Sequence, residues 1–274
     1  MSDLITGDTQ LAATKQAVIA AVVAKELAFQ AKLAPFFTDY SSWAVKGAKS
    51  VSVPKAGSLT AVDRATGVQG DASVLTFAAD LIPLDRNMYV AWIIDSSDEV
   101  QSRVEVQAEY ARRAASAIGR SHDSDSIALL QTAPVTTTVG NISQAIILEM
   151  RQSLLAAFAD MNQLYLAVGP DQEAKLLAIA EFVRSDSYGR LPTALQTGVI
   201  GQIYGINVVV HAGIAAGNYY MWEKSGVYFA NQLQPSMSSQ GANEFGSSAT
   251  RNAMDFLYGH KLGQAGLYLR DNNP

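Results

Sequence analysis

The residues that could do acid–base or metal chemistry gather in GRSHDSDS, residues 119–126. A histidine close to carboxylates can act as a general base with an orienting acid, or can help to hold a metal ion. However, neighbouring positions such as His122 and Asp123 do not share one face of a helix. The sequence also contains no HExxH pattern and no cysteine. We therefore interpret His122, Asp123 and Asp125 as part of a polar helix break after Gly119, with no metal site.

A second candidate is the glycine pattern of GVIGQIYG, which contains Gly198, Gly201 and Gly205. Such glycines cradle a phosphate when their loop follows a strand and opens a helix. Here the β-branched stretch INVVV follows instead, so the sequence predicts a tight turn between strands. No GK[ST] or GxSxG pattern is present. We interpret His211 and His260 as structural polar groups and expect no cofactor.

Composition narrows the class of protein further. The 274 residues are 49% hydrophobic and only 16% charged, with a formal charge of −5. A lone soluble domain usually carries more surface charge, so we expect part of the apolar surplus to face partner chains. The negative balance argues against a dedicated nucleic-acid reader. The apolar tract AVIAAVVA is too short to span a bilayer and continues in helical period, so no membrane segment is expected.

The first half of the chain has three kinds of pattern. Helical periodicity covers residues 9–33. Two extended stretches then flank a tip rich in Gly, Thr and Asp, between Trp43 and Trp92. Ser96 and Glu99 have capping-box spacing and open the longest predicted helix. This helix carries a narrow stripe of mostly small residues that would let another backbone approach closely: Val100, Val104, Ala108, Ala111, Ala115 and Ile118.

The second half alternates strands and helices. The patterns predict a helix over residues 142–158, a strand in NQLYLAV, a helix in GPDQEAKLLAIAEFV, a buried strand in INVVVHA and two short strands in NYYMWEKSGVYFA. NQLQPSMSSQGANEFGSS is interpreted as a loop. Residues 249–270 are predicted to form a long strand, a tight turn at Tyr258 and Gly259, and a second strand.

This order of elements resembles the major capsid proteins of tailed bacteriophages, whose coat fold was first described for a phage from Hong Kong. The passage LIPLDRNMYVAWIIDSSDEVQSRVEVQAEYARRAASAIGRSHDSDSIALL is similar to the family's extended loop leading into its spine helix. LYLAVGPDQEAKLL through GVIGQIYGINVVVHAGI is similar to its axial domain. NAMDFLYGHKLGQAGLYL is similar to its closing strands.

The resemblance implies an α+β fold with five parts. These are an N-terminal arm (1–40), an extended two-stranded loop (41–94), a spine helix with the start of the peripheral domain (95–139), a mainly axial domain (140–214) and return strands (215–274). It implies a non-enzymatic subunit that assembles with itself, as hexamers and pentamers, into an icosahedral shell around double-stranded DNA. The virion would form in the host cytoplasm, and scaffolding, portal and decoration proteins are possible partners. Packaged DNA would be contacted only weakly and non-specifically.

Some residues are expected to act between subunits. Arg64 and Arg86 lie in or beside the extended loop and are expected to meet acidic groups of a neighbour. Arg112 and Arg113 lie on the long helix with Glu109, where they form either a solvated face or an inter-subunit ion pair. Some coat proteins of this kind cross-link through Lys and Asn; Lys46, Lys49 and Lys55 lie in the loop, but their sequence does not establish that chemistry.

Two alternatives remain open at this point. A cellular nanocompartment shell has the same fold and encloses enzymes, and it would show a pocket for a cargo peptide. An α/β enzyme could also contain the strand–helix core, and it would show a deep pocket with convergent titratable groups.

Overall fold

The computed structural model describes residues 32–56, 77–95, 105–138, 141–179, 183–184, 199–241 and 249–272. The predicted helix over residues 9–31, the loop tip at 57–76 and the capping-box pair Ser96 and Glu99 lie outside this part of the chain. No helix in the described ranges is long and apolar enough to cross a membrane.

In the described residues, two short 3-10 helices and four strands come before the long helix. They are η1 (Ala34–Phe36), β1 (Thr38–Asp39), η2 (Ser41–Trp43), β2 (Ser50–Ala56), β3 (Phe77–Pro83) and β4 (Arg86–Asp95). The long helix is α3 (Glu105–Leu130). Strands then alternate with short helices: β5 (Val135–Thr138), α4 (Gln144–Ala156), η3 (Met161–Gln163), β6 (Leu164–Val168), α5 (Pro170–Leu177), β7 (Val183–Arg184), β8 (Val199–Ile203), β9 (Ile206–Val210), β10 (Asn218–Glu223), η5 (Lys224–Gly226), β11 (Val227–Gly241), β12 (Ala249–Leu262) and β13 (Tyr268–Asn272).

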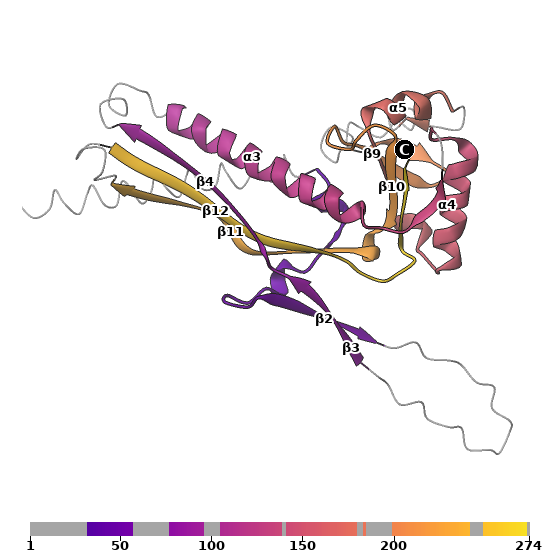
Figure 1. Cartoon of the computed structure of the whole chain (residues 1–274), viewed down its shortest axis with the longest axis horizontal. Helices are drawn as coiled ribbons and strands as arrows, with labels where there is room; N and C mark the ends of the chain where they lie inside the picture. The colour runs from indigo at the N-terminus through magenta and orange to yellow at the C-terminus, as the bar shows by residue number, and fades with distance from the viewer. Residues whose placement is uncertain are drawn as a thin grey trace, which may run out of the picture.

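The strands form three sheets that are spread along an elongated molecule (Figure 1). A four-stranded sheet has the order β1-β11-β12-β4, and α3 lies along it. A seven-stranded sheet at the other end has the order β5-β13-β10-β6-β9-β8-β7. The third sheet is the ribbon, β2 paired with β3, which projects away from both.

Helix α3 is held on the four-stranded sheet by its small side chains. Ala111, Ala114, Ala115 and Ile118 are buried against Met254, Phe256 and Tyr258 of β12, with Met88, Val90 and Trp92 of β4 at the edge. Small residues let the helix axis approach the sheet closely. The part of the predicted stripe that the structure describes therefore serves this intrachain contact.

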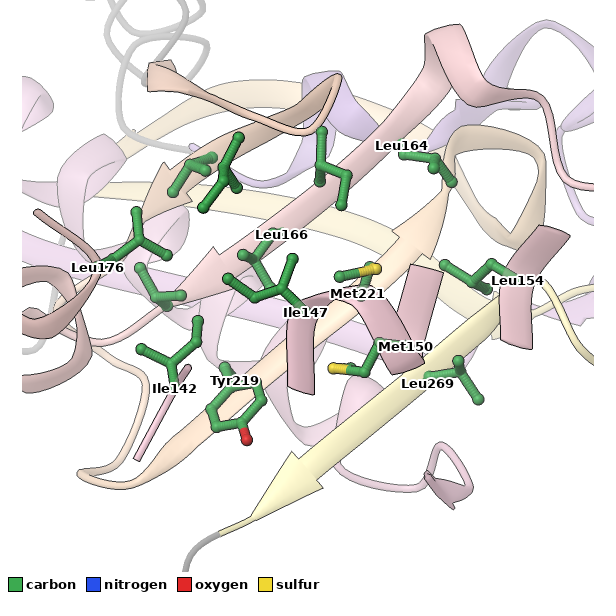
Figure 2. Packing of buried hydrophobic residues seen from close by; sticks show 14 of the residues in the cluster. Ile142, Ile147, Met150, Leu154, Leu164, Leu166, Leu176, Tyr219, Met221 and Leu269 are labelled. Carbon is green, nitrogen blue, oxygen red and sulfur yellow. The ribbon is translucent and has the colours of Figure 1, made fainter. Parts of the chain in front are cut away.

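The seven-stranded sheet is covered on both faces. On one face, α4 and α5 bury a cluster that includes Ile147, Met150, Leu154 and Leu176 against Leu166, Tyr219 and Met221 of the strands (Figure 2). On the other face, Tyr220 and Trp222 of the same strand β10 pack against the end of α3 and residues 33–37. The alternation along β10 follows from the two-residue period of a strand.

Local signals explain why α4 and α5 begin where they do. The Ser143 side chain accepts a hydrogen bond from the Ile146 backbone N–H at 3.5 Å and caps α4. Pro170 occupies the first turn of α5, and Asp171 and Glu173 complement the helix dipole there. The predictions of these helices and of β6 and β9 are confirmed.

Three predictions of local structure are wrong. The polar break after Gly119 does not exist, because α3 continues to Leu130 and buries Gly119. Residues 231–241 are not a loop but the second half of β11. Tyr258 and Gly259 are not a turn, because they lie inside β12 and pair with Asn231 and Ala230 of β11; the chain turns instead after Leu262.

Candidate functional site: assembly surfaces and a buried histidine cluster

The rings of His122 and His260 are in contact where α3 meets β12, and His211, in the loop after β9, is linked to the same stretch of α3 through Asp123. We call His122, Asp123, Asp125, His211 and His260 the histidine cluster. His122 is 1% exposed and lies against the rings of Phe229, Phe256, Tyr258 and His260, with a centroid distance of 4.5 Å to His260.

The His122 imidazole is buried without hydrogen bonds. Neither of its ring nitrogens has a hydrogen-bond partner among the described residues. Burial lowers its pKa, and this effect outweighs the opposing attraction of Asp123 and Asp125. His122 is therefore held in the neutral form by its apolar surroundings.

His260 is neutral as well, and its tautomer follows from Ser126. The Ser126 hydroxyl donates its proton to the His122 backbone carbonyl at 2.9 Å. Its oxygen lies 3.1 Å from His260 Nε2, so Nε2 must be the donor of that contact. Burial holds the pKa of His260 well below its ordinary value, and His122 and Arg86 lower it further.

Asp123 joins three parts of the chain with one buried carboxylate. Its oxygens accept hydrogen bonds from the backbone N–H groups of Lys32 at 3.0 Å and Leu33 at 3.3 Å. His211 Nε2 lies 3.0 Å from Oδ2 of the same carboxylate. His211 Nδ1 accepts from the Gly213 N–H at 3.0 Å, so Nε2 carries the proton that is donated to Asp123.

Asp125 connects α3 to β12 and β4. The Tyr258 hydroxyl donates to Asp125 Oδ2 at 2.7 Å, and burial together with this carboxylate raises the pKa of Tyr258. Arg86 Nε lies 3.6 Å from the same oxygen. The cluster is thus a set of hydrogen bonds between elements, and no group of three or more potential ligands in the described ranges could hold a metal ion.

Three of the arginines singled out in the sequence are described: Arg86 begins β4, and Arg112 and Arg113 are neighbours on α3. Arg86 contacts Asp125 of its own chain, and its side chain is 54% exposed. Arg112 and Arg113 are exposed on α3, and Arg113 Nε lies 3.1 Å from Glu109 Oε1. Arg64 lies outside the described residues. Lys46, Lys49 and Lys55 are exposed.

The glycine pattern forms a hairpin turn. Tyr204 and Gly205 both have positive φ, at 50° and 80°, between the antiparallel strands β8 and β9. A strand follows the glycines, so the turn lacks the helix N-terminus that a dinucleotide loop uses. This confirms the predicted tight turn; Gly198 lies outside the described residues.

Two strand surfaces are left uncovered in the described part of the chain. Within the described residues, β4 pairs only with β12, so its outer edge is open over ten residues. Tyr89 and Ile93 are half exposed on this strand. The ribbon is buried only at its root, where Val51, Val53, Ile82 and Leu84 pack against Ala230, while Leu81 is 52% exposed.

Solved structures of similar fold come from viruses and a virus-like particle. The chain is similar to a protein of Mycobacterium phage Che8 (19% identity, TM-score 0.67, covering 89% of this chain and 91% of that one). It is similar to a chain of the capsid of cyanophage P-SCSP1u, with 14% identity and a TM-score of 0.65, covering 87% of this chain and 86% of that one. It is also similar to a chain of a virus-like particle from Pyrococcus furiosus, with 10% identity and a TM-score of 0.60, covering 93% of this chain and 98% of that one. These likenesses confirm the predicted fold class.

Sequence comparison gives the more specific result. A search of curated proteins finds no match. The family model for phage capsid protein matches residues 41–249, which include the ribbon, α3, most of the seven-stranded sheet and strands β4 and β11 of the four-stranded sheet. That span is more than half of the chain, and the chain therefore belongs to the phage capsid protein family.

Proposed function

We propose that this major capsid protein builds its shell through the open β4 edge and the projecting ribbon. An open strand edge offers unpaired N–H and C=O groups to another chain. An isolated two-stranded ribbon is only marginally stable in water. The observation that carries the proposal is that the ribbon projects from the rest of the molecule (Figure 1) and has its buried residues near its root.

Several finer features belong to this proposal. Hexamers and pentamers of the chain close an icosahedral shell around double-stranded DNA in the host cytoplasm, and portal, scaffolding and decoration proteins are candidate partners. Arg112 and Arg113, with Arg86 beside Asp125, contact neighbouring subunits. The net charge of −5 limits adhesion of packaged DNA to the wall. The protein carries out no catalysis.

Electron microscopy and size-exclusion chromatography of the purified protein test this proposal. We expect closed particles, and in material from infected cells we expect DNA that is protected from nuclease. Particles that hold protein cargo in place of DNA would favour a nanocompartment. A monomer at every protein and salt concentration would contradict assembly altogether.

A further inference from the structure

The C-terminal turn of α4 contains a side chain that the fold of the subunit does not explain. Phe158 is 97% exposed, although a phenylalanine buries a large apolar area when it contributes to stability. Its φ is +63°, in the left-handed region that favours glycine. Phe158 is therefore both strained and solvated in the isolated chain.

The hydrogen bonds around Phe158 define the conformation that this position requires. The Ala159 N–H donates to the Leu154 carbonyl at 3.1 Å, and the Phe158 N–H donates to the Leu155 carbonyl at 3.0 Å. These two bonds form a Schellman motif, in which the residue just past the helix cap is usually glycine. Ala159 and Leu154 are buried in one cluster, and a hydrophobic contact between these two positions usually accompanies the motif. The local structure thus favours glycine at the position that phenylalanine occupies.

The turn packs closely on the rest of the subunit, so the backbone of Phe158 is held in a fixed position. A Cβ added to Gly266 would lie 2.9 Å from the Ala157 Cβ, which shows how closely the β12–β13 connection packs on the end of α4. Leu154 and Met150 anchor the preceding turns in the core (Figure 2). A preorganised aromatic side chain loses little entropy on binding and is typical of interface anchors.

The surface around Phe158 has the composition of an interface. The exposed positions of α4 are Gln144, Ala145, Leu148, Glu149, Gln152 and Ala156, of which Glu149 alone is charged, and Asp160 is the one charged and exposed residue of the turn that follows. Met161 is exposed beside the turn, and Arg151 contacts its sulfur at 3.8 Å. Arg151 Nε is buried without a partner among the described residues. Depletion of charge with enrichment of aromatic residues, Met and Arg distinguishes interface cores from other surface.

The position of α4 identifies the partner. Figure 1 views the molecule down its shortest axis, and α4 lies at the outer rim of the seven-stranded end. In a closed shell, the outer sides of each subunit meet other subunits. We propose that Phe158 is an anchor that inserts into a second copy of this chain at the axial end, with Met161 and Arg151 as its border; this rests on the proposed function.

The variant Phe158→Gly separates this role from folding. Glycine fits the left-handed position, so the thermal midpoint of the dissociated subunit should be unchanged or higher. The minimum concentration for reassembly into particles should rise by about tenfold or more, as expected when an anchor is lost. Phe158→Tyr keeps both the ring and the strained backbone, and it should reassemble close to the wild-type concentration.

A photo-crosslinking residue at position 158 tests the partner directly. In particles it should give a covalent dimer of the chain, and in dissociated subunits it should not. Reassembly of Phe158→Gly at the wild-type concentration, or crosslinks confined to one chain, would overturn the inference while wild-type particles still uphold the proposed function. If the wild type forms no particles, the proposed function fails and the inference fails with it.

Discussion

Asp123 is the residue on which the junction of three chain segments depends. Its carboxylate accepts from two backbone N–H groups near the start of the described chain and from His211 beyond β9. A buried acceptor that is removed leaves its donors without partners, and each such donor costs free energy. The same side chain was considered for metal or acid–base chemistry from its sequence neighbours, and its contacts give it a structural role.

We predict that Asp123→Ala lowers the free energy of unfolding by about 3 kcal/mol. The substitution leaves the backbone N–H groups of Lys32 and Leu33 and the ring Nε2–H of His211 without their acceptor. Chemical denaturation of the dissociated subunit measures this change. Asp85→Ala is the matched control, because Asp85 is exposed and its loss should change stability by no more than about 0.5 kcal/mol. Equal effects of the two substitutions would contradict the role of Asp123.

Burial of His122 and His260 makes the subunit sensitive to acid. Both have pKa values below the ordinary 6.5 in the folded state. As the pH falls below 6.5, the unfolded chain binds protons that the folded chain does not, so the free energy of unfolding decreases until the lowered pKa values are reached. Each imidazole contributes at most about 1.4 kcal/mol per pH unit in this range. Above 6.5 the contribution is constant.

We predict that His122→Leu reduces the loss of stability between pH 8 and pH 5.5, measured by denaturation at both values. Removing an unpaired polar group should also leave stability at pH 8 unchanged or higher. His122→Asn is the control, since it removes the titration but keeps a polar group in the apolar pocket. An identical pH dependence in the wild type and both variants would show that His122 does not titrate in this range.

At the scale of elements, local signals in the sequence predict much of the fold. Pro170 with its acidic first turn marks α5, and the glycine-bounded β-branched run marks β9. α3 could not be followed past Gly119 by propensity, because contacts with β12 outweigh the low helix propensity of glycine. β11 was missed because Pro235 and the polar run after it are typical of loops. Pro235 lies at a register shift between Leu233 and Ser236, where a strand tolerates proline.

The histidine cluster could not have been predicted from sequence spacing. His211 is 88 positions from Asp123, and His260 is 134 positions from Ser126. Nothing in the local pattern of either histidine indicates its partner, because the contact arises only when β12 and the loop after β9 are placed beside α3. The expectation that both histidines are structural polar groups agrees with their hydrogen bonds.

Because Gly259 has no side chain, the backbone of β12 can lie directly against the backbone at the end of β3. A Cβ at this position would lie 1.7 Å from the Pro83 carbonyl oxygen. We predict that Gly259→Ala lowers the free energy of unfolding by about 3 kcal/mol or more, since the obstacle is backbone and cannot move aside like a side chain. Gly47→Ala is the comparison: Gly47 has φ +87° but open space around it, and its substitution should cost about 1 kcal/mol. Thermal unfolding of the two variants measures the difference.

At the scale of the whole molecule, the ribbon projects from the body and contacts it at its root (Figure 1). The ribbon has seven-residue strands with a core only at its root, and the expected tip between them lies outside the described residues. We predict that protease cleaves between Ala56 and Phe77 in dissociated subunits and not in particles, because a neighbour covers this segment in the shell. Mass spectrometry of the fragments locates the cuts. Equal protection in both states would mean that the segment packs on its own chain.

The direct contact between Gly259 and Pro83 also links the direction of the ribbon to the shape of the four-stranded sheet. Because no side chain lies between the two backbones, we expect any bending of the four-stranded sheet under α3 to move the ribbon as well. A strand of seven residues reaches about 20 Å, so a rotation of about 10° at its root would move its far end by about 3.5 Å. One sequence would thereby reach neighbours at slightly different distances, which is what the proposed shell of hexamers and pentamers requires.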